Sequence, residues 1–346
     1  MDMKINLHNI KHSRGLSLVE LMVAMTVSAI LMLGISEIFS INSRSYKVQD
    51  ENARMQENGR FAFNTLMQDI RRAGYFGGSA AVDEITGSEG IATPARDCIS
   101  SNTTWGRMVE RAIYGLNDNN SHNDADGLLV NYTSCIPTGT ATGNYLRGDI
   151  LVTRYTKSAL IDPIPADNRL YIRTSLFAGR LFTGNNAVNA SSQNSVDEKP
   201  NAVRELAAHA YYVGPSGRNC RFNDASNNAI PIPALHREVL DAAGRPVREE
   251  VASGIENIQF QYGIDTDGDL TANRYVNANA LSNNDTTPNN WTQVVTVRLW
   301  VLVRADCPTN GFTNTKTYPM GDITYDPNPN DGFKRQLYST VVAVRN

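Results

Sequence analysis

The chain lacks the short motifs that mark the common enzyme and nucleotide-binding classes. Its 346 residues contain no G-x-S-x-G elbow, no P-loop and no G-x-G-x-x-G. Only His122, His209 and His236 among its histidines lie beyond the first fifteen residues, and none has the spacing of a metal ligand. Catalytic groups can still converge in space, so the sequence does not exclude an enzyme. It gives no positive reason to predict one, and we expect none.

An excess of basic residues is also absent. The 32 lysines and arginines are outnumbered by 35 acidic residues, which gives a net charge of −3, and the basic residues are scattered rather than clustered. Surfaces that bind nucleic acid need local positive charge to displace counterions. We therefore expect no direct contact with nucleic acid.

Cysteine is scarce, and no C-x-x-C spacing suggests a zinc knuckle or a redox pair. The chain has four cysteines: Cys98, Cys135, Cys220 and Cys307. An even number of them beyond an apolar segment predicts disulfides in an oxidising compartment, with free buried thiols as the alternative. Of the three pairings open to four cysteines, we favour Cys98–Cys135 and Cys220–Cys307, which close the less entangled loops.

A long apolar run follows a basic N-terminus. Residues 1–15 carry three basic side chains against one acid, and residues 16–36 contain no charge except Glu20. The 21 residues of this run would form a helix of roughly 31 Å, enough to cross the hydrocarbon core of a bilayer. The basic leader should remain in the cytoplasm, which predicts a periplasmic C-terminus.

A cleavable secretory signal is the first alternative for this segment. Such a signal needs a small-residue cleavage site after the apolar run. The sequence there reads Ile-Ser-Glu-Ile-Phe-Ser, and no cysteine lies near it to mark a lipoprotein. The breakpoint that stands out precedes the run, between Gly15 and Leu16. Cleavage at that point would keep the apolar helix in the mature protein.

The junction resembles the class III leader of type IV pilins and pseudopilins. That leader has a basic residue, Gly, a large apolar residue, Thr or Ser, two apolar residues and Glu. The matching residues are Arg14-Gly15-Leu16-Ser17-Leu18-Val19-Glu20. Leu16 in place of the commoner Phe and Ser17 in place of Thr are mild departures. The resemblance implies that a prepilin peptidase cuts after Gly15 and methylates the new amine of Leu16.

Glu20 is a costly residue in this position. A carboxylate in a membrane helix costs roughly 2.5–3.5 kcal/mol on insertion scales, so it tends to mark a function. In a filament, Glu20 would pair with the free amine of Leu16 on a neighbouring subunit and thereby favour the correct axial register. The alternative is an interfacial Glu that reaches back to the lipid headgroups.

The periodicity predicts one helix over residues 16–73. No proline occurs from Leu16 to Tyr75, and Gly74 follows two arginines as a stop signal. An apolar stripe runs along its second half through Val48, Met55, Gly59, Ala62, Leu66, Ile70 and Ala73. We divide the chain into a leader (1–15), a transmembrane half (16–36), an amphipathic half (37–75) and a β-rich globular domain (76–346). Gly34 and Gly59 are expected to be soft points of the helix.

Beyond Gly77 the pattern changes to short β-like runs. We predict strands at 127–133, 149–155, 208–213, 257–263, 294–304 and 336–344, and long loops at 183–201 and 277–290. Antiparallel sheet packed against one long N-terminal helix is an α+β, pilin-like fold. Trp300 lies on the polar side of strand 294–304, which marks either a contact surface or a second covering layer.

Later segments resemble landmarks of the PilW family of minor pilins. They are the sequences at 124–132, 235–240 and 251–269 and the C-terminal RQLYSTVVAVRN. The resemblance implies a structural subunit that takes part in the initiation, assembly or tip complex of a type IV pilus. The alternatives are a type II secretion pseudopilin and a membrane-tethered periplasmic binding protein or adhesin.

The same resemblance implies partners and a location. The partners would be other minor pilins, the major pilin, the prepilin peptidase, the inner-membrane assembly platform and a tip adhesin. The chain would cross the inner membrane once before assembly and lie in the pilus at the cell surface afterwards.

One segment has the spacing of a cation loop. Asp265, Asp267 and Asp269 alternate, and Asn273 follows four residues later, as in loops that supply oxygen ligands to Ca²⁺. The match is incomplete because Leu270 and Val276 occupy the positions of the invariant Gly and the bidentate Glu. A polar turn explains the segment as well, and we favour the turn over a calcium site.

Overall fold

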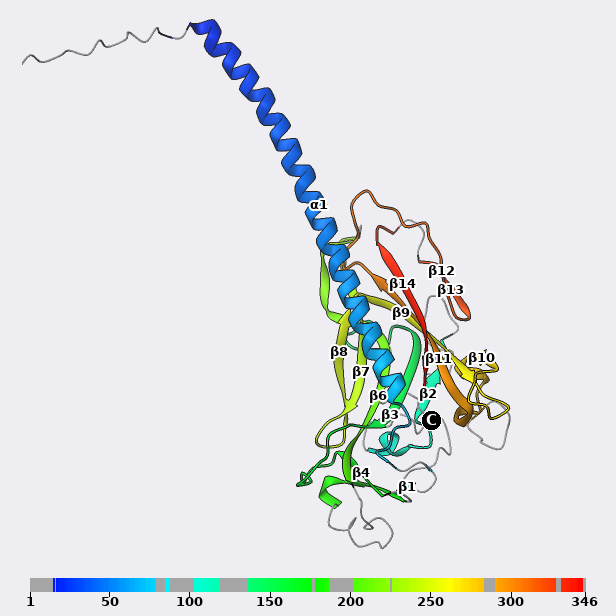
Figure 1. Ribbon diagram of the computed structural model, residues 1–346. Helices are drawn as coiled ribbons and strands as arrows, with labels where there is room; N and C mark the ends of the chain where they lie inside the picture. Colours follow the sequence, from blue (N-terminus) through cyan, green and yellow to red (C-terminus); the bar gives the residue numbers. More distant parts are fainter. Residues whose placement is uncertain are drawn as a thin grey trace, which may run out of the picture. The chain divides into compact units, whose positions relative to one another are not determined.

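A computed structural model gives the fold (Figure 1). It describes residues 15, 17–78, 82, 85–87, 103–118, 136, 137, 139–175, 178–186, 202–224, 226–282, 290–327 and 331–344. The chain divides into two compact units, Met1–Asp50 and Glu51–Asn346. The boundary falls inside the long helix, and each unit is described by itself.

Helix α1 spans Leu18–Arg72. Ser17 caps its start, because the Ser17 Oγ accepts the backbone N–H of Glu20 at 3.1 Å and the Ser17 carbonyl accepts that of Leu21. Its end follows from Gly74, whose φ of +85° is left-handed backbone that glycine adopts without strain. The helix expected at 16–73 is therefore confirmed to within two residues at each end.

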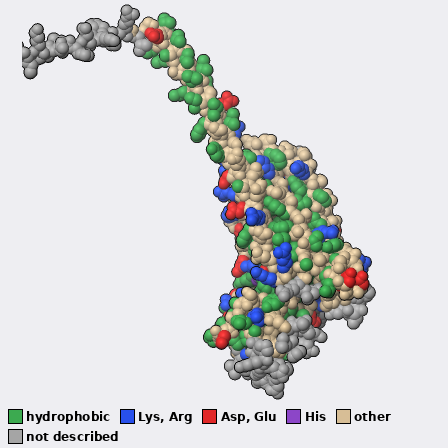
Figure 2. Space-filling model, in the orientation of Figure 1, with side chains coloured by type: hydrophobic (Ala, Val, Ile, Leu, Met, Phe, Trp, Pro, Cys, Tyr) green, Lys and Arg blue, Asp and Glu red, His purple; other side chains and the backbone are tan. Residues whose placement is uncertain are grey.

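From Leu18 to Asn42 the side chains of α1 are exposed on every side. The exposed apolar residues include Leu18, Val19, Leu21, Met22, Val23, Met25, Val27, Ile30, Leu31, Met32, Leu33, Ile35, Ile38, Phe39 and Ile41. Apolar side chains cover this stretch in the space-filling view (Figure 2). Among the described helices, α1 alone is long and apolar enough to cross a membrane, with a mean hydropathy of 2.3 over its best 18-residue window.

In the second unit α1 buries one stripe. Met55, Gly59, Ala62, Leu66 and Ile70 recur at spacings of three and four residues and face the sheets. The apolar side chains of this stripe belong to one core cluster with residues of β3, β6, β9 and β11, which include Leu151, Tyr211, Phe260 and Val303. Burial of this stripe against two sheets, rather than intrinsic helix propensity, stabilises this half of the helix.

Gly59 is a close-packing position and not a soft point. A Cβ on this residue would lie 2.7 Å from Cγ2 of Val303 and 2.8 Å from Cε2 of Tyr338. The absence of a side chain lets α1 approach the sheet directly. The expectation of local softness at Gly59 is therefore wrong, whereas Gly34 has no atom within 4 Å of such a Cβ.

The larger sheet has eight strands in the order β1-β5-β4-β6-β3-β2, with β7 beside β6 and β8 beside β7. All its pairings are antiparallel except β1 with β5. The strands are β1 (Ile85–Thr86), β2 (Ile113–Leu116), β3 (Arg147–Thr156), β4 (Leu170–Thr174), β5 (Gly179–Thr183), β6 (Ala202–Asn223), β7 (Ala229–Leu240) and β8 (Pro246–Ser253). Strand β6 organises the sheet, since it pairs with β4, β3 and β7 along its 22 residues.

The second sheet has four antiparallel strands in the order β10-β9-β11-β14. They are β9 (Ile255–Ile264), β10 (Arg274–Val276), β11 (Val294–Arg304) and β14 (Arg335–Ala343), and a separate hairpin is formed by β12 (Tyr318–Met320) and β13 (Ile323–Tyr325). Short 3₁₀ helices occupy Thr103–Arg107, Gly184–Asn186, Ala278–Ala280 and Trp291–Gln293. The α+β, pilin-like fold is thus confirmed.

Five of the six predicted strands fall within observed strands. They are 149–155 in β3, 208–213 in β6, 257–263 in β9, 294–304 in β11 and 336–344 in β14, which ends at Ala343. Strand 127–133 lies outside the described residues. The loop expected at 183–201 begins with the last residue of β5 and a 3₁₀ turn, and its remainder from 187 is not described. Residues 278–280 of the other expected loop are also helical.

A disulfide joins Cys220 and Cys307, with their Cα atoms 5.2 Å apart. Cys220 lies near the end of β6 and Cys307 follows β11, so the bond connects the two sheets. This half of the favoured pairing is confirmed. Cys98 and Cys135 lie outside the described residues, and their pairing stays a prediction.

Trp300 is covered rather than free. Its half-buried side chain packs against a cluster formed by Leu302 of β11 and the β12–β13 hairpin, with Met320 and Ile323 in that cluster. The covering-layer alternative therefore explains the half-buried part of Trp300.

Candidate assembly interface

The N-terminal motif lies at the first turn of α1. Gly15 and Ser17 precede the helix, Leu16 is outside the described residues, and Glu20 is the third helical residue. The Ser17 hydroxyl accepts the Glu20 N–H, whereas the Glu20 carboxylate accepts no hydrogen bond from any residue that the structure describes. It is exposed and forms no ion pair with any residue the structure describes. The positive end of the helix dipole also stabilises a negative charge at this position.

The apolar surface of α1 surrounds this charge. Leu18, Val19, Leu21 and Met22 are exposed immediately beside Glu20. An all-round apolar helix has no solvated face, so it must be buried by lipid or by other helices. Glu20 therefore places a single carboxylate on a helix surface that is otherwise apolar in this stretch.

A second charged residue on α1 lies in the core of the domain. Asp69 is 4% exposed. Its carboxylate accepts hydrogen bonds from the hydroxyls of Tyr155 on β3 at 2.7 Å and Tyr211 on β6 at 2.5 Å, and lies 2.5 Å from Nδ1 of His209. His209 and Tyr211 are two residues apart on β6 and therefore point to one face of the sheet. The cluster fixes the last turn of α1 to two adjacent strands.

The electrostatics of this cluster favour a charged Asp69. Burial acts to raise the pKa of Asp69, but the hydrogen bonds and charge of His209 and the two tyrosine hydroxyls outweigh it and lower the pKa. Burial and the nearby Asp69 raise the pKa of Tyr211 and of Tyr155. Both hydroxyls therefore remain donors, and the carboxylate remains the acceptor.

Sequence reasoning missed this cluster, although a signal was present. Asp69 interrupts the apolar stripe between Leu66 and Ile70, where a solvated carboxylate is out of place. His209 and Tyr211 alternate within a predicted strand. A polar residue on an apolar stripe requires buried partners, but only the fold shows which strands supply them.

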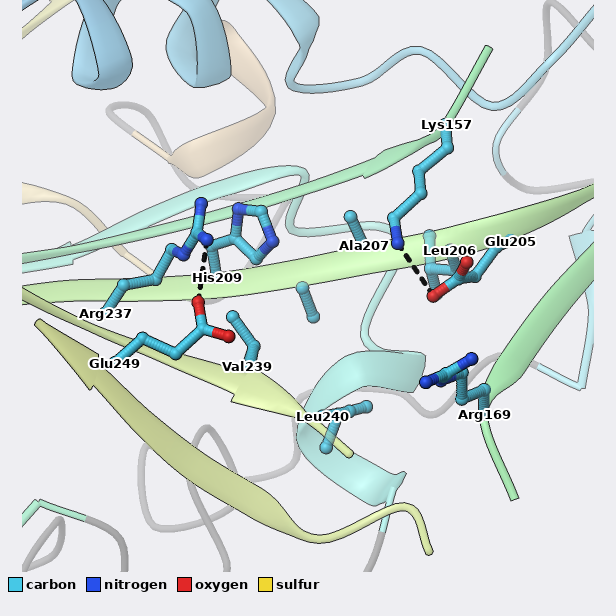
Figure 3. A pocket seen from close by; sticks show the side chains of 11 residues that line it. Lys157, Arg169, Glu205, Leu206, Ala207, His209, Arg237, Val239, Leu240 and Glu249 are labelled. Carbon is cyan, nitrogen blue, oxygen red and sulfur yellow. Dashed lines mark hydrogen bonds and ion pairs between the residues drawn. The ribbon is translucent and has the colours of Figure 1, made fainter. Parts of the chain in front are cut away.

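A cavity of about 390 Å³ lies beside this cluster (Figure 3). Its lining includes two ion pairs, Lys157–Glu205 at 2.9 Å and Arg237–Glu249 at 2.7 Å. Arg169 lies 3.7 Å from Asp167. The charges around the cavity are thus neutralised within the chain, which suits a structural surface better than recognition of a charged ligand.

The segment with the spacing of a cation loop is a hydrogen-bonded turn between β9 and β10, the alternative favoured from the sequence. The oxygens of Asp265, Asp267 and Asp269 lie within 4.8 Å of one another. Both oxygens of Asp265 accept backbone N–H groups, from Asp267 and Gly268 at Oδ1 and from Leu270 at Oδ2. The turn is therefore stabilised by its own amides. Calcium binding at this loop stays a hypothesis.

Comparison with known proteins supports the N-terminal and the C-terminal assignments separately. A family model described as the prokaryotic N-terminal methylation motif matches residues 10–36, and one described as Type IV Pilus-assembly protein W matches residues 210–346. No curated protein and no solved structure matches the chain. The first match covers Gly15, Leu16 and Glu20, and the second covers the domain from β6 to the C-terminus. Together with the apolar helix and the β-rich domain, these two matches support a type IV pilin of the PilW family.

Proposed function

We propose that this pilin is a minor pilin that takes part in the initiation or tip complex of a type IV pilus. The observation that carries the proposal is the first half of α1, an all-round exposed apolar helix that begins beside a methylation motif. Lateral packing of such helices buries apolar surface that a soluble domain would not expose. The PilW match favours a pilus over a type II secretion system.

Before assembly the chain is proposed to cross the inner membrane once, with the domain in the periplasm, and afterwards to lie in the pilus. Its proposed partners are the prepilin peptidase, the assembly platform, the major pilin, other minor pilins and a tip adhesin. The proposed role is structural. Two ion pairs, Lys157–Glu205 and Arg237–Glu249, occupy the lining of the cavity in Figure 3.

Glu20 is proposed to select the axial position of the subunit. Its carboxylate forms no ion pair within the described chain, and its own amide is capped by Ser17. The new amine of Leu16 on a neighbouring subunit would supply the opposite charge once the leader is removed. Among apolar helices an unpaired carboxylate is costly, so registers that pair the two charges are favoured.

Mass spectrometry of the mature N-terminus tests entry into the assembly pathway. The expected result is a chain that begins at N-methylated Leu16. An intact leader, or a start beyond residue 36, would rule out the proposal and favour a membrane tether or a secreted form. Counting surface pili in a strain that lacks the chain then tests the role in initiation, and a strong reduction is expected.

Replacement of Glu20 tests the pairing mechanism. Glu20→Ala should reduce incorporation into pili without changing the melting temperature of the domain, because residue 20 lies in the other compact unit. Glu37→Ala, which removes a second exposed carboxylate of α1, is the matched control and should assemble normally. Normal incorporation of the Glu20 variant would disprove the pairing.

The calcium hypothesis has its own test. Isothermal titration of the purified chain with millimolar Ca²⁺ would show heat, and melting would shift upward, if the carboxylates of 265–269 bind the ion. The double variant Asp267→Asn, Asp269→Asn should abolish both signals. No heat and no shift in the wild-type chain would reject a calcium site.

A further inference from the structure

The outer face of the second sheet is only partly covered. On β11 the residues Val297, Leu299, Val301 and Val303 are buried against the core, whereas Thr296, Arg298 and Trp300 alternate with them on the opposite face. The β12–β13 hairpin packs at the Trp300 end of this face. Arg298 lies on the same face, two residues before Trp300, and therefore beyond the part of the face on which the hairpin packs.

Arg298 is held between two aromatic rings. Its guanidinium carbon lies 3.9 Å from the ring centroid of Tyr275 on β10 and 5.9 Å from that of Trp300. Gly263 of β9 makes the first contact feasible, because a Cβ there would lie 3.0 Å from Cε1 of Tyr275. The Tyr275 ring can therefore cross β9 and reach β11, where Thr296 donates to its hydroxyl at 3.3 Å.

The guanidinium has no anionic partner in the described chain. No hydrogen bond or ion pair of Arg298 to any described residue accompanies the two ring contacts. A guanidinium that stacks on an aromatic face keeps the N–H groups along its edge free. Two of these N–H groups can donate to the two oxygens of a carboxylate, in a bidentate hydrogen bond. The aromatic rings also fix the side chain, so little conformational freedom remains to be lost when it binds.

An exposed apolar residue lies directly beside this cation. Val341 of β14 is the register partner of Arg298 and is 48% exposed. Residues opposite each other in an antiparallel pair share one face of the sheet. Arg298, Tyr275 and Val341 form what we call the Arg298 patch, and Trp300 forms its wall. Tyr and Arg beside an apolar side chain are typical of the centres of protein interfaces.

We propose that the Arg298 patch binds a different pilin subunit through an acidic side chain that adjoins an apolar one. The proposal rests on the filament role proposed above. Charge complementarity selects the acid, because Arg298 is the uncompensated charge of the patch. A stacked sugar fits less well: Arg298 covers a face of Tyr275, and Gly321 lies against Trp300, with its Cβ position 3.4 Å from Cζ3 of that ring.

Crosslinking in the native host tests this contact with the full-length chain. A photoreactive phenylalanine analogue at position 341 is expected to give one adduct with another pilin, and the crosslinked peptide should contain Asp or Glu. Arg298→Glu should lower the yield by about tenfold or more, because it places like charges in contact. Arg298→Lys, which keeps the charge but loses the planar stack, should lower it less.

Arg218→Glu is the matched control. It makes the same change in charge at an exposed position of β6, in the other sheet, and should leave the adduct unchanged. Retention of the Cys220–Cys307 disulfide in each variant checks that the domain has folded. Replacing the acid of the partner by Arg should restore the adduct with Arg298→Glu.

The outcomes separate this proposal from the filament role. If loss of the chain abolishes pili while Arg298→Glu leaves pili and adduct intact, the patch is wrong and the filament role stands. An adduct between two copies of this chain, or with a peptide that lacks an acidic residue, also overturns the patch. If the chain keeps its leader and pili form without it, the filament role itself fails.

Discussion

Asp69 shows how one residue can join the helix to the sheets. The carboxylate accepts hydrogen bonds from the hydroxyls of Tyr155 and Tyr211 and contacts His209, so one charge binds three side chains from two strands. A buried donor without an acceptor costs about 1–3 kcal/mol. The cluster therefore specifies which turn of α1 meets β6.

Asp69→Asn is expected to lower the free energy of unfolding by about 2–4 kcal/mol. The variant removes the negative charge and places an NH₂ group, itself a donor, against the hydroxyl donors that surround this position. Thermal unfolding of the purified chain in detergent micelles measures the effect. Glu57→Gln, an exposed change on the same helix, is the control and should stay within about 0.5 kcal/mol of wild type. Equal stability of the two variants would show that the cluster contributes nothing.

The pH dependence of Asp69 follows from its lowered pKa. A carboxylate whose pKa is lower in the folded than in the unfolded state stabilises the fold fully above the unfolded value of about 3.9. That contribution is lost as the pH falls through the folded pKa. The stability difference between wild type and Asp69→Asn should accordingly shrink below about pH 4.

The pKa of Glu238 is shifted in the opposite direction to that of Asp69. Burial raises its pKa to about 7, although Arg248 at 3.5 Å and the hydroxyl of Tyr212 act to lower it. Between about pH 4.3, the usual pKa of a glutamate, and about pH 7, the carboxyl group of Glu238 loses its proton in the unfolded state but keeps it in the folded state. The wild-type chain loses stability as the pH rises from about 4.3 to about 7.

Glu238→Gln should remove this loss. Its stability relative to wild type should rise between about pH 4.5 and pH 7 and stay level at higher pH. Urea unfolding at a series of pH values measures the difference. Glu249→Gln, a more exposed carboxylate on β8, is the comparison variant. A difference that falls with pH would contradict the assigned shift.

At the scale of the element, the close approach of α1 to the sheet depends on Gly59. Gly59→Ala should destabilise the domain by about 1–3 kcal/mol, because its Cβ would overlap the side chains of Val303 and Tyr338. Gly34→Ala adds the same methyl group where nothing lies within 4 Å and should leave the melting temperature of the domain unchanged. An unchanged melting temperature for both variants would mean that the helix adjusts at no cost.

Local pattern predicted α1 and β11 well. A long run without proline and a terminal glycine predicted α1, and strict alternation of valines and leucine predicted β11. Strand β7 was not predicted. Pro231 and Pro233 lie near its start, and two polar residues, His236 and Glu238, are buried within it. Its partners on β6 and β8, rather than its own pattern, make it a strand.

The residues of the candidate site likewise include some that local sequence predicts and some that only the fold brings together. Gly15, Leu16 and Glu20 lie within one short motif of seven residues, Arg14–Glu20, so the sequence alone can predict them. The Asp69 cluster and the Arg298 patch each join residues from separate elements, and register determines which side chains meet. Tyr275 reaches Arg298 only because the intervening residue of β9 is Gly263. Neither cluster has a signature along the chain.

For the whole molecule, the Cys220–Cys307 disulfide is a covalent crosslink between the two sheets, in addition to the backbone connections. Cys220 and Cys307 are separated by 87 residues, a loop for which chain entropy predicts a stabilisation of about 4–5 kcal/mol. Cys220→Ser with Cys307→Ser should therefore lower the midpoint of urea unfolding markedly. Adding reductant to the wild-type chain should produce the same midpoint, and adding it to the double variant should change nothing further. A double variant with the wild-type midpoint would contradict this estimate.

The same bond closes a covalent ring that contains β7, β8, β9, β10 and β11. A protease that cuts once inside this ring cannot release a fragment, since both pieces stay tied through sulfur. A nicked subunit would migrate as one band on a gel until a thiol is added. A subunit displayed at a cell surface could in this way survive a single cut without shedding any part of itself.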